Sequence, residues 1–357
     1  MIVNTYNQLN FCINLKETIF KDDKVTLVVS DHSKNAEMVA VRLRDEECFE
    51  RVYFVETLGT GDHRNNYDKL KDFFDITFNS SNRYDFWVSK IDDKIFDELL
   101  VFNFTIETYG IFSILSSLNS SLKISRFEEG LLSYNTIVIE TKRRDLINKI
   151  RFFLGKPTVD RALDSFYCFY PELYRGFLDK KKVDFIERNG AASRIISNIY
   201  DLKRNVLDYK EKYIFFTSVY DFEGGKSIGE YDLVCRVANV VGKNNLLVKI
   251  HPRDTRTLYQ DNGFIVDKNS SIPWEAIQLA GDFCDKIFMT VNSTSVLAGS
   301  TMSDKQVRTY YMYKLCDISG NWACKKTVGD IEDLLNKEEM KGILKTVHIA
   351  EKLEEIL

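Results

Sequence analysis

Short apolar runs rich in β-branched and aromatic residues alternate along the chain with longer segments in which apolar residues recur at helical spacing. In the first half, the apolar runs predict strands at Ile2–Thr5, Lys24–Ser30, Arg51–Val55, Asp85–Val88, Leu100–Phe104, Leu122–Phe127 and Thr136–Glu140. The helical segments between them include Asn35–Phe49, Glu107–Leu118 and Thr141–Leu154. Strands that alternate with helices indicate βαβ units and a mostly parallel sheet.

The same alternation returns in the second half of the chain. It predicts strands at Tyr213–Ser218, Leu246–His251, Gly263–Val266, Ile287–Val291 and Arg308–Met312, and helices at Ser227–Val241 and Pro273–Ala280. Between the halves lies an aromatic-rich, irregular stretch that contains the basic run Lys180–Lys182. At 357 residues the chain is long enough for two cores. We therefore expect an α/β fold of two Rossmann-like domains with mostly parallel sheets facing a cleft, at residues 1–155 and 211–357, joined by a connecting segment over 156–210.

Composition narrows the class of protein. Hydrophobic residues make up 44% of the chain and charged residues 29%, which is ordinary for a soluble globular protein, and the net charge of −4 argues against nucleic acid as the main partner. The chain lacks a basic start followed by an apolar core and any apolar run of the roughly 20 residues that span a bilayer, so we expect a cytoplasmic location. The 7 cysteines show no C-x-x-C spacing and predict neither a disulfide framework nor a zinc site.

Two adjacent carboxylates and a glycine, Glu128-Glu129-Gly130, follow the strand predicted at Leu122–Phe127. At a strand end that faces a cleft, one of two neighbouring acids can have its pKa raised by the other and act as a general base. The glycine permits a sharp turn after them. Charged pairs are also common in turns, so the functional interpretation depends on the other candidate sites.

The second candidate site is His251, which ends the strand predicted at Leu246–His251 and is followed by Pro252. An imidazole can donate a proton or a hydrogen bond to a leaving phosphate near neutral pH, and Lys249 and Arg253 could add positive potential. Strand alternation places Lys249 and His251 on one face and Arg253 beyond the turn. The alternative interpretation is a loop histidine held rigid by the proline that follows it.

The third candidate site is the hydroxyl cluster Ser293-Thr294-Ser295, which follows the strand predicted at Ile287–Val291 and precedes a helical segment at Val296–Met302. Backbone N–H groups at a helix start, together with hydroxyls, suit one phosphate group. The same residue types are also the preferred N-caps of helices. The two interpretations are compatible, because a capping hydroxyl can bind phosphate where the helix end faces a cleft.

Motifs of other chemistries are absent from the sequence. No G-x-G-x-x-G, H-E-x-x-H or D-x-D occurs, so neither a metal nor a cofactor is expected. The segment Gly224-Gly225-Lys226-Ser227 resembles the end of a P-loop, but Tyr220 stands where its first glycine belongs. His32 and His63 are isolated, and His348 is expected in a charged C-terminal helix, so none of them is assigned to a site.

Taken in this order, the three candidate sites resemble the motifs of bacterial sialyltransferases of GT-B architecture, and the closest likeness is to glycosyltransferase family 52. That pattern is two acids and a glycine, then His-Pro, then paired Ser/Thr, and here it stands as Glu128-Glu129-Gly130, His251-Pro252 and Ser293-Thr294-Ser295. Ile272-Pro273-Trp274-Glu275 is similar to the segment in which a glutamate of that family binds the CMP ribose. The likeness spans nearly the whole chain.

The resemblance implies a metal-independent, inverting transfer of sialic acid from CMP-sialic acid to a hydroxyl of a bacterial surface glycan, such as capsule or lipooligosaccharide. Residues 1–155 would then bind the acceptor and residues 211–357 the nucleotide sugar. The implied catalytic residues are Glu128, Glu129 and His251, and the implied substrate-binding residues are Lys249, Pro252, Glu275, Ser293, Thr294 and Ser295. In parts of the family the base lies shortly before the His-Pro strand, which makes Glu230 the alternative base, with Glu223 and Asp232 as further acids in that segment.

The implied partners are a CMP-activated donor and a glycan acceptor, with peripheral association with the inner face of the cytoplasmic membrane and a homodimer as further expectations. Two other interpretations stay open. One is a relative that uses another nucleotide sugar, because a ribose contact at Glu275 serves any nucleotide. The other is a non-catalytic glycan- or nucleotide-binding protein of capsule assembly. A complete set of acid, histidine and hydroxyl residues favours the enzyme.

Overall fold

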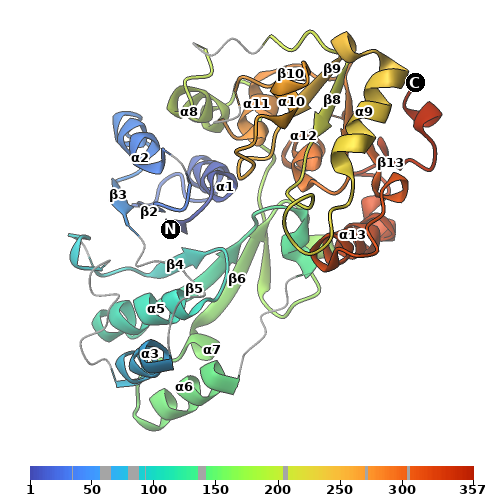
Figure 1. Cartoon of the computed structure of the whole chain (residues 1–357). Coiled ribbons are helices and arrows are strands. Elements are labelled where there is room, and N and C mark those ends of the chain that lie inside the picture. Colours follow the sequence, from blue (N-terminus) through green and yellow to red (C-terminus); the bar gives the residue numbers. More distant parts are fainter. Residues whose placement is uncertain are drawn as a thin grey trace. The chain divides into compact units, whose positions relative to one another are not determined.

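A computed structural model describes residues 1–33, 35–56, 66–78, 88–92, 94–135, 142–203, 208–269, 272–303 and 306–357. The chain divides into two compact units (Figure 1). Unit 1 comprises Met1–Glu129 and Ser133–Asp184, and unit 2 comprises Gly130–Leu132 and Phe185–Leu357. Each unit is described by itself.

Unit 1 contains two parallel sheets. The first has the strand order β1 (Ile2–Val3), β2 (Thr26–Ser30), β3 (Arg51–Val55). The second has the order β4 (Glu98–Val101), β5 (Lys123–Phe127), β6 (Leu163–Cys168), β7 (Asp179–Lys182). The short strand β1 lies against β4, so the amino-terminal strand runs where the two sheets meet. Because the strands of each sheet are parallel, the loops that follow them gather at one edge of that sheet.

The helices of unit 1 connect these strands. They are α1 (Tyr6–Glu17), α2 (Ala36–Asp45), α3 (Asn66–Phe78), α5 (Ile106–Leu118), α6 (Lys142–Phe153) and α7 (Val159–Ala162). Helices α1 and α5 begin at threonine caps. The Thr5 hydroxyl accepts a hydrogen bond from Gln8 N at the start of α1, and Thr105 does the same for Thr108 N at α5. Ile124 of β5, Phe112 of α5 and Ile147 of α6 belong to one buried apolar cluster.

Unit 2 contains one parallel sheet. Its strands are β8 (Tyr213–Phe216), β9 (Leu246–Lys249), β10 (Ile265–Val266), β11 (Ile287–Thr290), β12 (Arg308–Tyr311) and β13 (Val347–Ile349). They lie in the order β10-β9-β8-β11-β12-β13. Counted along unit 2, this is the order 3-2-1-4-5-6 of the Rossmann fold, in which ligands bind outside the carboxyl ends of the strands where the order reverses. That point falls between β8 and β11.

The strand at this point shows why the sequence folds in this way. All four residues of β8, Tyr213–Phe216, are buried, as expected for a central parallel strand that is covered on both faces. The connecting helices of unit 2 are α8 (Ala191–Ile199), α9 (Glu230–Val241), α10 (Leu258–Asp261), α11 (Trp274–Ala280), α12 (Ala298–Met302) and α13 (Trp322–Leu335). The ring of Trp274, at the start of α11, packs edge-on against Phe216 with centroids 4.8 Å apart.

The predicted α/β class with mostly parallel sheets and two Rossmann-like domains is confirmed. The boundary lies later than predicted, because β6 and β7 belong to the second sheet of unit 1 and α8 belongs to unit 2, which divides the predicted connecting segment 156–210 between the units. The predicted strand Thr136–Glu140 and most of Asp85–Val88 fall outside the described residues, as does His63. The cleft stays a prediction.

One element of the C-terminal region corrects the sequence analysis. His348 was expected in a charged helix, but it lies in β13, the edge strand beside β12, with its ring centroid 5.3 Å from that of Tyr310. The segment Val347–Ile349 has only three residues, too few to show a period in the sequence. Among the helices that the structure describes, none combines the length and apolar character needed to cross a bilayer.

Candidate active site

Glu128 is the first residue after β5 and is almost fully buried, with 1% of its surface exposed. Its Oε2 atom accepts hydrogen bonds from the Tyr134 hydroxyl and from Phe169 N, the latter at 2.9 Å. Burial raises the pKa of Glu128 to about 7, and the two hydrogen bonds oppose that rise. Both bonds use Oε2 and neither uses Oε1. Glu128 is therefore a carboxyl group fixed in position, and its pKa allows it to gain or lose a proton near neutral pH.

Glu129 is held in a similar way but is less buried. Its Oε1 atom accepts hydrogen bonds from Thr5 Oγ1 at 2.6 Å and Gln8 Nε2 at 2.9 Å, and its backbone N–H donates to Ser133 Oγ at 3.0 Å. Burial raises the pKa of Glu129, against the effect of the two side-chain donors. The predicted turn follows, because Gly130 has a φ of 154°, which L side chains rarely adopt.

These partners come both from the amino-terminal segment and from the turn that follows the acid pair. Thr5 and Gln8 stand at the start of α1, directly after β1, and Tyr134 lies in the 3-10 turn Leu131–Asn135. Sequence reasoning did not assign them to the site. The sequence did offer one indication of Thr5, because this residue ends the first predicted strand. It offered no indication of Tyr134.

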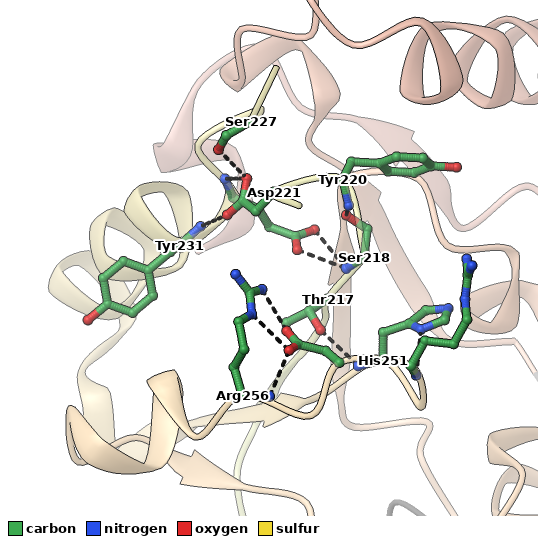
Figure 2. A network of polar contacts seen from close by, with 11 residues as sticks. Thr217, Ser218, Tyr220, Asp221, Ser227, Tyr231, His251 and Arg256 are labelled. Carbon is green, nitrogen blue, oxygen red and sulfur yellow. Dashed lines mark hydrogen bonds and ion pairs between the residues drawn. The ribbon is translucent and has the colours of Figure 1, made fainter. Parts of the chain in front are cut away.

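His251 lies just beyond the carboxyl end of β9 and is half-buried. Its backbone N–H donates to Thr217 Oγ1 at 2.9 Å, which ties it to the loop after the neighbouring strand β8 (Figure 2). Thr217 was not singled out in the sequence, although the end of a predicted strand could have indicated it. The bond holds His251 next to the place where the strand order reverses.

The turn after His251 fixes the proton on its ring. Arg253 N donates a hydrogen bond to His251 Nδ1 at 3.1 Å, so Nδ1 is an acceptor and the neutral ring carries its proton on Nε2. Burial, and then the charge of Arg253, lower the pKa of His251, while Glu223 and Asp254 act in the opposite direction. At neutral pH the ring is therefore an uncharged donor through Nε2–H.

The two cations near His251 do not join it as the sequence suggested. Lys249 Nζ forms a buried ion pair with Asp267 Oδ2 at 2.8 Å, and both side chains are almost fully enclosed. Lys249 therefore stabilises the packing of β9, and its charge is compensated, which corrects its predicted role in substrate binding. Arg253 pairs with Glu223 at 2.9 Å on the surface, and its side chain is 63% exposed.

Ser293, Thr294 and Ser295 follow β11, on the other side of β8 from His251. They begin a 3-10 turn, Thr294–Leu297, that leads into α12. Ser293 N donates to Thr290 Oγ1 at 2.9 Å, but the Ser293 side chain makes no capping hydrogen bond. The capping interpretation is therefore wrong for Ser293, and the half-buried side chains are held at the strand end by backbone bonds.

The other predicted substrate-binding residues also lie in unit 2. Pro252 is exposed in the turn after His251. Glu275 is half-buried in the first turn of α11, and Pro273 occupies the N-cap position of that helix. Ile272 and Trp274 on either side of Pro273 are buried and anchor this segment in the core.

Glu230, the alternative base, is buried at the start of α9. Both of its carboxylate oxygens accept from Ser218 N, at 3.0 and 2.8 Å, and burial raises its pKa to about 8. Asp221 completes this network by accepting from Ser227 Oγ at 2.9 Å and from the backbone N–H of Tyr231 at 3.2 Å (Figure 2). The arrangement favours a positioning role for Glu230, in which it holds the loop that carries Thr217, over a role as base.

Replacing Glu230 with glutamine should flatten the dependence of stability on pH. In the folded protein the pKa of Glu230 is about 8, above its ordinary value of 4.5. The folded state therefore holds the proton more tightly, and the stability that this gives is fully present below the ordinary pKa of 4.5. It is lost as the pH rises through the folded pKa of about 8. We expect the unfolding temperature of the wild type to fall more between about pH 5 and 8 than that of Glu230→Gln. Glutamine keeps an oxygen for Ser218 N.

The matched control is Asp232→Asn, which removes an exposed carboxylate from the same helix. Its unfolding temperature should follow the wild-type curve when measured by differential scanning fluorimetry across the pH series. Parallel curves for the wild type and Glu230→Gln would show that Glu230 does not bind a proton more tightly in the folded state.

The two units carry different chemical groups at the ends of their strands. Unit 1 holds the two carboxyl groups after β5, and unit 2 holds the imidazole of His251 and the hydroxyls of Ser293–Ser295 after strands that flank β8. Neighbouring parallel strands are about 4.8 Å apart, so positions after β9 and β11 are separated by about 10 Å, which is room for a phosphate group. In the parts of the chain that the structure describes, no cluster of His, Cys, Asp and Glu is arranged to hold a metal ion.

A comparison with protein-family models decides the family. The model of alpha-2,8-polysialyltransferase (POLYST) matches residues 1–311. The chain belongs to this family. Membership of the polysialyltransferase family supports a sialyltransferase, and therefore an enzyme that uses a nucleotide-sugar donor and a glycan acceptor. The motif-based assignment to glycosyltransferase family 52 is not tested by this match.

Several solved structures are similar to this polysialyltransferase-family chain. The alpha/beta-galactoside alpha-2,3-sialyltransferase of the luminous marine bacterium Photobacterium phosphoreum has a TM-score of 0.47 at 12% identity, over 100% of this chain and 98% of that one. The UDP-GlcNAc 2-epimerase of Methanocaldococcus jannaschii has a TM-score of 0.42 at 11% identity, over 94% and 92%. The spinosyn rhamnosyltransferase SpnG has a TM-score of 0.45 at 8% identity, over 98% and 97%. No curated protein sequence matches the chain.

Proposed function

We propose that this member of the polysialyltransferase family transfers sialic acid from CMP-sialic acid to a hydroxyl of a bacterial surface glycan, capsule or lipooligosaccharide, with inversion. The observation that carries the proposal is a neutral, Nε2-protonated His251 after β9 of unit 2, and unit 1 separately offers a carboxyl group of pKa about 7 after β5. One group can accept a proton near neutral pH and the other can donate a hydrogen bond to phosphate. The motif resemblance to glycosyltransferase family 52 and the cytoplasmic location stay predictions.

On the donor side, His251 and the hydroxyl cluster would hold the phosphate of CMP. As the bond to the sugar breaks, negative charge grows on a phosphate oxygen, and a hydrogen bond from His251 Nε2–H becomes stronger. A phosphate monoester has a second pKa near 6, so CMP can leave without being fully protonated. The imidazole then keeps its proton, which fits a ring whose Nδ1 is already occupied by Arg253 N.

On the acceptor side, the acid pair would remove the proton of the attacking hydroxyl. Displacement with inversion requires attack from the side opposite the leaving phosphate, so the base must act on the face of the sugar away from the phosphate. The family resemblance assigns the CMP ribose to Glu275. No step of this mechanism needs a metal, because a single phosphate can be managed by neutral donors.

The decisive experiment is a transfer assay with the full chain. The protein should convert CMP-sialic acid and a sialylated oligosaccharide acceptor into an elongated product. Its activity should persist in EDTA. CMP, but neither UDP nor GDP, should raise the unfolding temperature. Stabilisation by UDP alone would point to another nucleotide sugar. Stabilisation by CMP with no turnover on any acceptor would point to a binding protein.

Replacing Ser293, Thr294 and Ser295 together with alanine should weaken CMP binding about tenfold or more, because hydrogen bonds to a charged phosphate are lost. The unfolding temperature should hardly change, since the Ser293 side chain makes no capping bond. Isothermal titration calorimetry measures the affinity. Thr301→Ala is the control, because the Thr301 hydroxyl donates within its own helix to Leu297 O at 3.1 Å. Wild-type CMP affinity in the triple variant would remove the cluster from the donor site.

A further inference from the structure

Helix α3 of unit 1 exposes a row of apolar side chains to solvent. Its exposed side chains are spaced three to four residues apart and so share one side of the helix. They are Tyr67, Leu70, Phe74 and Phe78, exposed by 72%, 55%, 49% and 44%. The inner side is formed by Ile76, which is fully buried in the core of unit 1, together with Asp72 and Asp75, exposed by only 1% and 7%. The helix therefore carries apolar side chains on both sides, and contiguous exposed apolar side chains mark an interaction surface.

Helix α6 packs beside α3 (Figure 1). Cations and apolar residues alternate along its outer side, in the order Lys142, Leu146, Lys149 and Phe153. These residues are three or four positions apart, so they lie on one side of the helix. Phe153 is 86% exposed, while Ile147 on the inner side is fully buried. Lys156 Nζ donates to Phe78 O at 2.8 Å and joins the carboxyl ends of the two helices.

The charges around these apolar residues are mostly positive. Segment 142–156 contains six basic residues, Lys142, Arg143, Arg144, Lys149, Arg151 and Lys156, and one acid, Asp145. Of these, Arg151 is buried inside the unit, and Asp145 pairs with Lys149 Nζ at 2.7 Å, so Lys142, Arg143, Arg144 and Lys156 supply the excess positive charge. Lys71 is exposed on α3, and the Arg161 guanidinium lies 4.0 Å from the centroid of the Phe152 ring. We call this surface the α3–α6 face, defined by Tyr67, Leu70, Lys71, Phe74, Phe78, Lys142, Leu146, Lys149, Phe152, Phe153 and Leu154.

We propose that the α3–α6 face docks on an anionic lipid surface. Aromatic and aliphatic side chains that alternate with lysines on a helix lying along a surface are the pattern of interfacial helices, which bury their apolar side in the headgroup region. Lysines beside them gain from the negative potential of acidic lipids. A second copy of the same face would bring like charges together, so charge complementarity favours lipid over self-association. The proposal does not rest on sialyl transfer.

The test is sedimentation of the full chain with vesicles. One set consists of phosphatidylcholine alone, and the other of equal parts of phosphatidylcholine and phosphatidylglycerol. We expect binding to the anionic vesicles to be at least about tenfold tighter, and to weaken when salt is raised, because several cations contribute.

Two double variants separate the apolar and the charged contributions. Phe74→Ser/Phe153→Ser and Lys142→Gln/Lys149→Gln should each weaken binding to anionic vesicles about tenfold or more. The matched control is Phe177→Ser/Trp322→Ser, which removes two aromatic side chains of similar exposure, 66% and 71%, away from the face. Unfolding temperatures, and turnover on a soluble acceptor, should stay at the wild-type level in all three, since none of these residues belongs to the proposed site.

Three outcomes would overturn the proposal. The first is a wild type that sediments with neither vesicle set. The second is an equal loss of binding in the control variant, which would indicate general adhesion of exposed aromatic residues. The third is a wild-type dimer in analytical ultracentrifugation that becomes a monomer in Phe74→Ser/Phe153→Ser, which would give the face to a second copy of the chain. Failure of the transfer assay would leave vesicle binding unaffected.

Discussion

His251→Ala should lower turnover at least about a hundredfold, the range expected when a positioned donor to the leaving group is removed. The physical reason is the geometry of the turn: Nδ1 is occupied by Arg253 N, so Nε2–H is the only ring donor that can meet the phosphate. The unfolding temperature should stay close to that of the wild type, because the bond from residue 251 to Thr217 Oγ1 comes from the backbone. Steady-state kinetics with CMP-sialic acid measure the loss.

A second substitution distinguishes hydrogen bonding from proton transfer. His251→Gln places an amide N–H near the position of Nε2 and should recover at least about a tenth of the activity if a hydrogen bond is what matters. An amide cannot transfer a proton, so equal losses in the Ala and Gln variants would assign His251 as a general acid. The control is His348→Ala in β13, which removes an exposed imidazole from the same sheet. Full activity in His251→Ala would remove this residue from the mechanism.

Burial separates the central strands of unit 2, which the sequence predicted, from the edge strand β7, which it missed. Central strands such as β8 and β11 consist of buried apolar residues, so hydrophobicity alone locates them. The edge strand β7 is Asp179–Lys182 and is exposed throughout, which in the sequence resembles a basic loop. Charged edge strands protect a sheet from pairing with other chains. The charges of β7 therefore have a structural reason, but a search for hydrophobic runs does not detect such a strand. Helix α1 was missed because Gln8, Asn10 and Asn14 are buried polar residues on its inner side.

The ends of the predicted strands were enough to locate the candidate site residues in the sequence. They were not enough to predict the protonation and pairing of those residues. The sequence placed His251 and Ser293–Ser295 after strands, and the strand order brings those ends to either side of β8. Three properties depend on contacts that the pattern of strands does not reveal: the proton position on His251, the pairing of Lys249 with Asp267, and the burial of Glu230. The pairing of Lys249 in particular shows that sharing a strand face with His251 does not place two side chains in one site.

Glu128→Gln should lower turnover at least about a hundredfold, as expected for loss of a general base, while CMP binds as in the wild type. Of the two carboxyl groups, Glu128 is the one whose pKa of about 7 suits a base at neutral pH. A base acts when it is deprotonated, so kcat/KM of the wild type should rise with pH up to about 7 and then level off. Glutamine has no proton to lose there, and the rising limb should disappear.

Glu129→Gln is the matched comparison, because glutamine keeps an Oε1 atom for Thr5 Oγ1 and Gln8 Nε2. We expect a milder loss of turnover and a pH profile that still rises towards about 7, since Glu128 remains. The reverse pattern, with the limb lost only in Glu129→Gln, would move the base to the more accessible carboxylate. A collapse of turnover in Glu230→Gln alone, with wild-type pH profiles in both other variants, would place the base on unit 2. Burial raises the proton affinity of Glu128 but also limits the access of the acceptor hydroxyl to its carboxyl group. The pH profiles of these variants show whether proton affinity or access determines which residue is the base.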